Sequence, residues 1–443
     1  MCINHELDYS TISAQTPCAS IMSLITALDS DSDDEEDDNE DTLLVTLVAA
    51  SYLLLVVDCN LARRAAKWQH TRLSWDWHVV QLRHENLFER MYRMTYDAFV
   101  ALKRILGDGI VLNADHSPGV MPIPSEIVMA TGLRWMSGCP SLDLHISMGM
   151  SLTSVYRCRD IFVYAVNEAP ELRLVFPDSP DAIDWVCKQF ESQSLNQLMR
   201  GCVGCIDGYL AVTVRPSMAD SEHNPGAFRS GHYGVYGLNV QAVCNYRSRF
   251  TFFAVAAQGK CADQLAFERT SLPTLMEALP IGKYLVGDAA YSVSEKMLVP
   301  FTGSQRNNAN NDAYNFCLSQ LRIRIEMAFD LMSNKWKILR TPLQTSLKTS
   351  ARILECCSKL HNFCINHDGD QFMDETVAFR EILPVPGADL GWGYLPTVEP
   401  LVSIPGTSQM RDIIVWRVGN LAIRRPAENL ERHRYELQDI NLM

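Results

Sequence analysis

The chain has 443 residues, 47% of them hydrophobic and 21% charged, which is typical of a globular protein of about two or three domains. Its fourteen cysteines follow no regular spacing and no signal-peptide pattern precedes them, which excludes a disulfide framework and favours a reducing compartment. The net charge is −13, but ten acidic residues and no base stand between positions 29 and 41. The rest of the chain carries −3, so a local basic surface for nucleic acid is not excluded.

The first two segments differ sharply in polarity. Residues 1–41 are rich in Ser, Asp and Glu, bury too little apolar surface to order themselves, and are predicted to form a disordered acidic leader. The apolar run 42–57 has 16 residues, which is short for a membrane span. We interpret it as a buried helix and expect no membrane-spanning segment.

A basic and aromatic stretch follows at 61–106. Nine Lys and Arg residues are interleaved there with Trp68, Trp75, Trp77 and Tyr92. This interleaving suits contact with nucleic-acid phosphates. A solvated helical face whose tryptophans pack inward is the equally open alternative.

The pattern between 124 and 169 is helical and interrupted by Gly and Pro. Ser125 is predicted to cap a helix that runs to Gly138, a short helix is predicted at 143–148, and Ser151 is placed to cap a third helix. A helix, a tight glycine turn and a capped helix are similar to a helix-turn-helix.

In a helix-turn-helix the first residues of the last helix face the DNA groove. Thr153, Ser154 and Arg157 hold those positions here, so they are the candidate DNA-binding residues. A three-helix scaffold without DNA contact is the alternative.

From residue 203 the periodicity becomes strand-like. Three extended runs, 203–206, 238–243 and 250–257, predict a meander. The elements predicted after them are a helical stretch 263–279, a buried strand 284–286, a helix 315–339, a proline-rich loop segment and a helix near 411–418. Strands followed by helix, strand and helix predict an α/β layer sandwich.

Two aspartates follow predicted core strands. Asp207 is placed at the end of the first strand and Asp288 comes directly after the strand 284–286. Ligand sites of open α/β sheets lie at such strand ends. A single Asp beside Gly is more often a turn residue, but two in one sheet favour a site.

A third acidic residue, Glu326, flanks the apolar stripe of the helix 315–339. Arg322 stands four residues earlier, so an ordinary surface ion pair is the alternative interpretation. Three carboxylates in one cleft require a cation, and Mg²⁺ or Mn²⁺ is the natural partner of oxygen ligands. Two such ions are suited to phosphodiester hydrolysis and transesterification.

Six blocks occur in order between residues 200 and 365. They are the strand that ends in Asp207, Tyr236-Gly-Leu-Asn-Val-Gln-Ala-Val, Asp263-Gln-Leu-Ala-Phe, Gly287-Asp-Ala-Ala-Tyr, Ile325-Glu-Met-Ala-Phe and Leu360-His-Asn-Phe. Their order and spacing make the chain similar to the Harbinger/PIF-type DDE transposases.

The resemblance implies an α/β fold with an RNase H-like mixed-sheet core behind an α-helical N-terminal region. It implies that Asp207, Asp288 and Glu326 are the catalytic metal ligands, with Mg²⁺ or Mn²⁺, two ions, as cofactor. It also implies strand cleavage and transfer of double-stranded DNA at terminal inverted repeats, together with a separate Myb-like helper protein. We therefore expect a homo-oligomer in the nucleus, imported with a partner, and otherwise in the cytoplasm.

The chain divides into four predicted parts. They are the disordered acidic leader 1–41, a helical DNA-binding region 42–175, an RNase H-like DDE nuclease core 176–365 and a loop-rich C-terminal extension 366–443 with one helix.

The chain departs from the family after the glutamate. Asp330 and Met332 stand where relatives usually carry Gly and a basic residue, which removes positive charge beside the expected DNA path. Two alternatives to an active transposase stay open. One is a host nuclease that cuts without strand transfer, and the other is a domesticated DNA- or protein-binding factor without catalysis.

Three further residues are interpreted as structural. Cys202 and Cys205 have zinc-ligand spacing without a second pair nearby, and strand alternation is expected to point them to opposite faces as buried thiols. His361 is expected to be a packing residue of a helix.

Overall fold

The computed structural model describes residues 71–112, 122–369 and 407–426. The predicted leader 1–41, the apolar run 42–57 and the prolines between 384 and 405 lie outside these residues. None of the helices placed in these three ranges is both long and apolar enough to cross a membrane.

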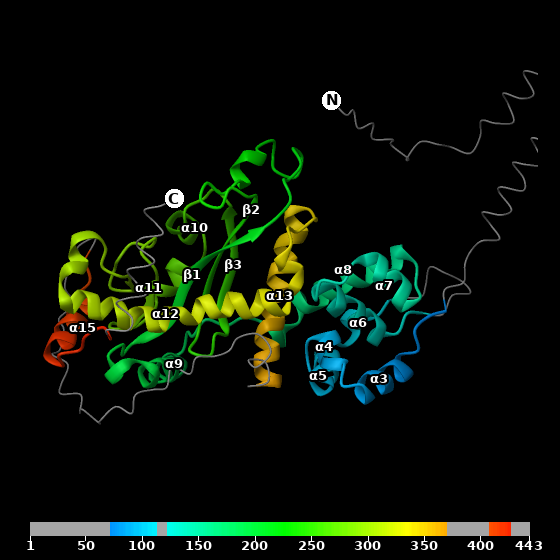
Figure 1. Cartoon of the computed structure of the whole chain (residues 1–443), viewed down its shortest axis with the longest axis horizontal. Coiled ribbons are helices and arrows are strands. Elements are labelled where there is room, and N and C mark those ends of the chain that lie inside the picture. The colour runs from blue at the N-terminus through cyan, green and yellow to red at the C-terminus, as the bar shows by residue number, and fades with distance from the viewer. Residues whose placement is uncertain (1–70, 113–121, 370–406, 427–443) are drawn as a thin grey trace, which may run out of the picture. The chain divides into compact units, whose positions relative to one another are not determined.

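Six α-helices form the N-terminal region of the described chain (Figure 1). They are α3 (Trp75–His84), α4 (Phe88–Tyr92), α5 (Tyr96–Leu106), α6 (Ser125–Met136), α7 (Ser141–Met148) and α8 (Leu152–Glu168). The predicted cap Ser151 is confirmed, since its side chain accepts a hydrogen bond from the Ser154 amide. The predicted cap Ser125 is wrong, because Pro124 is the N-cap residue of α6 and makes no side-chain cap.

The aromatic residues of α3 to α5 pack mostly inward. The Trp75 ring stacks on Phe99 at a centroid distance of 5.0 Å, and Tyr92 is fully buried beside them. Trp77, by contrast, is 70% exposed. The inward-packing interpretation therefore holds for Trp75 and Tyr92, because their rings build the core of this region.

Five strands form one mixed sheet in the order β3-β2-β1-β4-β5. They are β1 (Cys202–Val212), β2 (Gly237–Cys244), β3 (Phe250–Gln258), β4 (Tyr284–Val286) and β5 (Met297–Leu298). The first three pair antiparallel, as predicted, and β4 and β5 continue the sheet parallel to β1. The sheet is thus a meander extended by parallel strands.

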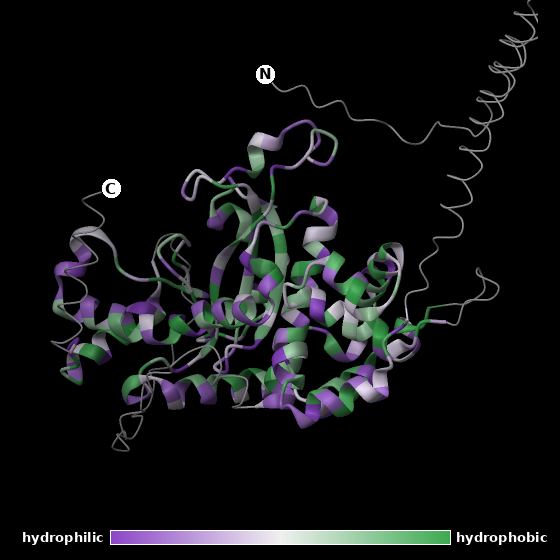
Figure 2. Ribbon diagram, turned by 45° about the vertical axis from the view of Figure 1, so that its right-hand side comes forward, coloured by the Kyte–Doolittle hydropathy of each residue, from purple (hydrophilic) through white to green (hydrophobic). Residues whose placement is uncertain are grey.

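Helices cover both faces of this sheet. They are α9 (Pro180–Gln193), α10 (Asp263–Glu268), α11 (Leu272–Glu277), α12 (Ala309–Lys335) and α13 (Leu347–Asp368), followed by α15 (Gln409–Asn420), which packs on α12. α12 packs against β1 and β2, and α13 packs against β3 and α8. The two faces bury two separate hydrophobic clusters, and the strands are mostly green in Figure 2. The predicted α/β layering is confirmed.

Several boundaries of this part differ from the prediction. The helix predicted at 315–339 is α12, which begins at Ala309 and ends at Lys335. The helical stretch 263–279 is two helices, α10 and α11, because Pro273 lies in the first turn of α11, where its missing N–H cannot continue a preceding helix. The first strand runs six residues beyond Ile206, because β2 pairs with β1 as far as Val212.

Candidate active site

Asp207 lies inside β1 rather than at its end. Parallel pairing of β1 with β4 stops at Cys205, whereas pairing with β2 places Asp207 opposite Ala242. The carboxylate is therefore on a strand that continues past the edge of β4. One oxygen, Oδ1, accepts a hydrogen bond of 2.8 Å from the Gly208 amide.

Asp288 lies two residues after β4, at its carboxyl end, where the strand pattern predicted it. Its Oδ1 accepts a hydrogen bond of 2.9 Å from the Ala290 amide, as a turn aspartate does. Two contacts hold the loop that carries it. Tyr291 Oη donates to Gln241 Oε1 of β2 at 2.6 Å, and the Ser292 amide donates to Gln264 Oε1 of α10 at 2.8 Å. The loop position is therefore set by β2 and α10.

Glu326 lies on α12 and is linked to Asp207 through one guanidinium. Arg322 Nη2 lies 2.5 Å from Glu326 Oε1, and Arg322 Nη1 lies 3.4 Å from Asp207 Oδ2. The predicted surface pair of Arg322 with Glu326 thus exists, but it also reaches across to the sheet. Asp207 of β1 and Glu326 of α12, which are far apart in the sequence, therefore contact the same guanidinium group, that of Arg322.

The electrostatics of this cluster centre on Asp207. Burial, the charge of Asp288 and that of Glu326 raise the pKa of Asp207 to about 7, although Arg322 opposes the shift. A carboxyl group in this situation binds a proton or a cation more readily than one in water. The charges of Asp288 and Glu326 therefore both act on Asp207.

A polar network lies on the opposite face of the sheet and was not predicted. Asp263 Oδ1 accepts hydrogen bonds from Asn239 Nδ2 at 2.9 Å and from Gln241 Nε2 at 3.1 Å. A Cβ atom at Gly208 would lie only 2.3 Å from Asp263 Oδ1, so glycine is required beside Asp207. The signal was present in the sequence, because polar Asn239 and Gln241 share the inward side of a central strand.

The residues that we interpreted as structural are buried. His361 Nε2 lies 2.8 Å from the Ser248 carbonyl oxygen, and burial lowers the pKa of His361 to about 4. Cys202 and Cys205 are both buried, but the expectation of opposite faces is wrong. Both join the cluster on the α12 side, because the register shifts between Cys202 and Gly204.

Met332, which stands where relatives usually carry a basic residue, lies in the core of the protein. Met332 is fully buried in the core, so a basic residue there would not face DNA in this fold. The expectation that Met332 removes charge from a DNA path is therefore wrong for this chain. Asp330 is exposed on α12, one turn beyond Glu326.

The three candidate DNA-binding residues lie in the first turns of α8. Thr153 and Arg157 are exposed, and Ser154 is half-buried. The Ser154 hydroxyl already pairs with Ser151 Oγ at 2.9 Å. Thr153 and Arg157 are thus the two of the three whose side chains face solvent.

The donor set at Asp207, Asp288 and Glu326 consists of oxygen atoms, which hard divalent cations prefer. In the described part of the chain, no three His, Cys, Asp or Glu side chains lie close enough together to hold one ion. The raised pKa of Asp207 nevertheless indicates a shortage of positive charge, since burial and Asp288 outweigh Arg322. The chemistry of the donor atoms therefore fits a divalent cation, whereas the spacing of the three side chains does not form a closed ligand set in this structure.

The comparison with protein families gives the class of protein. The family model described as "DDE superfamily endonuclease" matches residues 206–362, a segment that contains Asp207, Asp288 and Glu326. The chain carries a DDE superfamily endonuclease domain.

Named relatives narrow this class. The chain is 23% identical to "Putative nuclease HARBI1" of Mus musculus over 301 residues, 67% of this chain and 80% of that protein. It is 22% identical to the Homo sapiens protein of the same name over 63% of this chain and 78% of that protein. "Protein ALP1-like" of Arabidopsis thaliana is 23% identical over 66% of this chain and 72% of that protein. No solved structure matches the chain. The resemblance to Harbinger transposase-derived nucleases is confirmed.

Proposed function

We propose that the chain is a divalent-metal-dependent endonuclease that cleaves and transfers DNA strands at terminal inverted repeats. The observation that carries the proposal is the linkage of Asp207, Glu326 and Asp288 in one charge cluster inside the matched domain. Mg²⁺ or Mn²⁺, as two ions, would be held by these three carboxylates. The ions would activate the attacking oxygen and stabilise the leaving oxygen of the phosphodiester.

The proposed core fold is RNase H-like. Its support is the sheet order β3-β2-β1-β4-β5 with an antiparallel meander and two parallel strands. We also propose the division into the leader 1–41, the helical region 42–175, the core 176–365 and the extension 366–443. In this arrangement Asp207 is central in the sheet, and α12 brings Glu326 to the same face.

The side chains divide the work of the proposed site. Asp207 would present its carboxylate from β1, Asp288 from the loop after β4 and Glu326 from α12. Tyr291 anchors the Asp288 loop to β2 and so fixes the approach of that carboxylate. Arg322 balances Asp207 and Glu326 in the metal-free protein and is free to pair with a DNA phosphate once both carboxylates bind cations.

The second candidate is a domesticated DNA- or protein-binding factor without catalysis. It is favoured by the Arg322 bridge between Asp207 and Glu326. It is also favoured by the spacing of the acids, since no three such side chains within the described ranges are grouped tightly enough for one ion. A host nuclease that cuts without transfer would share the proposed site.

Cleavage of a labelled duplex that carries a terminal inverted repeat tests the proposal. We expect nicking by the wild type with Mg²⁺ or Mn²⁺ and none with EDTA. Glu326→Ala is expected to lower the rate by more than about 100-fold, because one ligand is lost. Asp330→Ala is the matched control, since it removes an exposed carboxylate one turn away on α12 and should cleave normally.

The outcomes separate the candidates. Wild-type silence with intact DNA binding, and with a Myb-like helper protein added, would favour the binding factor. Cleavage without joining to a target duplex would favour the host nuclease. An equal loss of cleavage activity in Glu326→Ala and Asp330→Ala would show that Glu326 is not part of the active site.

DNA binding by the first turns of α8 is a separate prediction. Arg157→Ala is expected to weaken duplex binding about tenfold and to lower the salt dependence by about one phosphate contact, because one exposed cation is removed. Fluorescence anisotropy against salt concentration measures both. Arg173→Ala is the control, because it removes an exposed charge outside α8. If Arg173→Ala weakens DNA binding as much as Arg157→Ala does, the loss of affinity comes from net charge alone.

The remaining proposals concern assembly and location. We propose that the chain acts as a homo-oligomer, that a Myb-like protein assists its DNA binding, and that it reaches the nucleus with that partner, being otherwise cytoplasmic. Their support is the relationship to Harbinger-type nucleases.

A further inference from the structure

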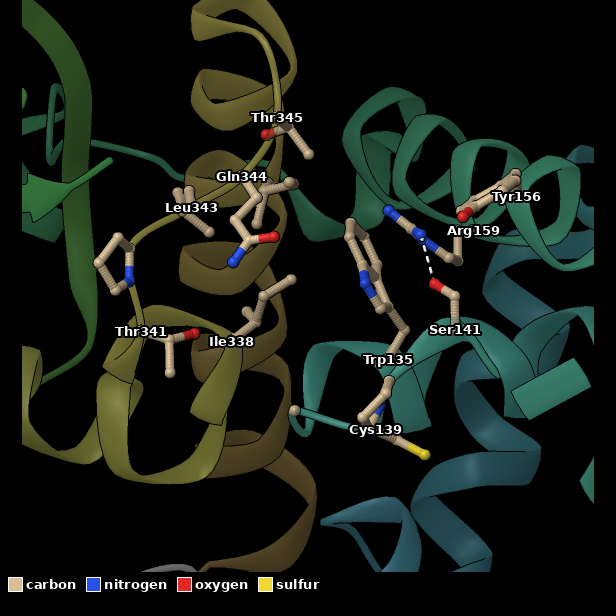
Figure 3. A pocket seen from close by; sticks show the side chains of 14 residues that line it. Trp135, Cys139, Ser141, Tyr156, Arg159, Ile338, Thr341, Leu343, Gln344 and Thr345 are labelled. Atoms are coloured by element: carbon tan, nitrogen blue, oxygen red, sulfur yellow. Dashed lines mark hydrogen bonds between the residues drawn. The ribbon is translucent and has the colours of Figure 1, made fainter. Parts of the chain in front are cut away.

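A cavity of about 570 Å³ opens where α6, α7 and α8 meet the segment between α12 and α13. Side chains from both parts of the chain line it, as Figure 3 shows. Trp135 and Arg159 contribute from the helices, and Thr341 and Gln344 contribute from the segment. The volume is that of a small-molecule site, and it is separate from the acidic cluster.

The cationic element of the cavity is Arg159. Its guanidinium lies 3.6 Å from the centroid of the Trp135 ring, and Nη1 donates to Ser141 Oγ at 2.7 Å. Its Nε is buried and has no hydrogen-bond partner in the described structure. Burial also lowers the pKa of Arg159. None of the lining residues is acidic, and the carboxylate of Asp160, whose charge raises the pKa of Arg159, stands outside the cavity lining.

The aromatic element is Trp135. Arg159 covers one face of the indole, and the other face is turned toward Ile338 and Gln344 across the cavity (Figure 3). Tyr156 adds a second ring at the rim and is 45% exposed. A flat aromatic surface beside an unsatisfied guanidinium suits a ligand that joins a planar ring to an anion.

We propose that this cavity binds one unpaired nucleotide, with the base against the side of Trp135 that borders the cavity and the phosphate at Arg159. Nucleotides combine these two groups within the available volume, whereas inorganic anions lack the ring. The DNA source of the nucleotide rests on the proposed function. Arg157, on the same helix, faces solvent beside the rim residue Tyr156, so a strand bound along α8 would deliver a nucleotide here.

Calorimetric titration of the full chain tests the ligand chemistry. We expect dTMP to bind at least about tenfold more tightly than thymidine or inorganic phosphate, because only dTMP engages both Trp135 and Arg159. A single-stranded oligothymidylate that binds more tightly than dTMP assigns the site to a DNA strand. Preference for dTMP over the oligonucleotide assigns it to a free nucleotide. Phosphate that binds as well as dTMP would overturn the proposal.

Variants locate the binding. Arg159→Gln is expected to reduce dTMP affinity to that of thymidine, and Trp135→Phe to retain stacking. Thr341→Trp should abolish binding by filling the cavity from an exposed loop position. Thr302→Trp places the same ring at an exposed position elsewhere and should bind normally, as should Glu326→Ala.

Melting temperatures show that each variant is folded. Unchanged dTMP affinity in both folded variants, Arg159→Gln and Thr341→Trp, would contradict the site. If the wild type binds dTMP as expected but does not cleave DNA, the nucleotide site is supported and the proposed endonuclease function is contradicted.

Discussion

Replacing Asp207 with asparagine is expected to abolish metal-dependent cleavage and, at the same time, to raise the melting temperature of the metal-free protein at pH 8. Loss of this carboxylate should lower cleavage by more than about 100-fold, because it removes a ligand from the centre of the cluster. The stability gain has a different origin. The asparagine side chain would not carry the charge that burial and Asp288 oppose.

The direction of the pH dependence follows from the raised pKa. The ordinary pKa of Asp207 is 3.8, and in the folded protein it is about 7. Between these values the folded chain binds more protons than the unfolded chain, so its stability falls as the pH rises from 4 to 7. The penalty above pH 7 is at most about 4 kcal/mol. Asparagine removes it, and the two proteins should melt alike near pH 4.

Thermal melting at pH 4 and pH 8 in EDTA measures this difference. Adding Mg²⁺ at pH 8 should raise the melting temperature of the wild type and leave Asp207→Asn unchanged, because ions stabilise only the form that binds them. Asp330→Asn changes an exposed carboxylate and serves as the control. An Asp207→Asn protein that melts below the wild type at pH 8 would refute the charge argument, and one that cleaves DNA would refute the site.

Replacing Gly132 with alanine is expected to destabilise the helical region. Alanine in place of glycine inside a helix ordinarily stabilises by about 1 kcal/mol. Here a Cβ atom at position 132 would lie 2.2 Å from Cγ of Phe162, which is fully buried on α8. Overpacking of this kind costs about 1–3 kcal/mol. Because the contact is so short, the clash outweighs the helix propensity, and the net loss should be up to about 2 kcal/mol.

Urea denaturation followed by circular dichroism measures the loss. Gly231→Ala is the control, because a Cβ atom there meets no atom within 4 Å. The double variant Gly132→Ala with Phe162→Leu should recover part of the stability lost by the alanine, since a smaller side chain relieves the contact. A Gly132→Ala protein more stable than the wild type would show that α6 and α8 do not cross closely at this residue.

The sequence pattern was sufficient to predict the helices and strands that are determined by residues close together in the sequence. The apolar periods gave α8, with its cap at Ser151, and the buried strand β4 before Asp288. The meander of β1 to β3 was also predictable, because alternation and a short turn are properties of neighbouring residues. The apolar stripe of the helix 315–339 placed Glu326 on a helix for the same reason.

Contacts between distant segments were not predictable in this way. Asp207 is inside β1 because β2 continues the pairing, and Arg322 reaches it because α12 crosses the sheet. The burial of Met332 likewise depends on which side of α12 meets the core. Each of these depends on how elements pack.

The chain's own periodicity thus indicated the α/β class and the order of the strands, but it gave no range for α9 or α13. Tertiary structure alone decided the charge on Asp207, the Arg322 bridge and the cavity between Trp135 and Thr341. The physical reason is the range of the interactions. Backbone geometry and side-chain alternation act within one element, whereas burial and charge depend on neighbours that come together only when the chain folds.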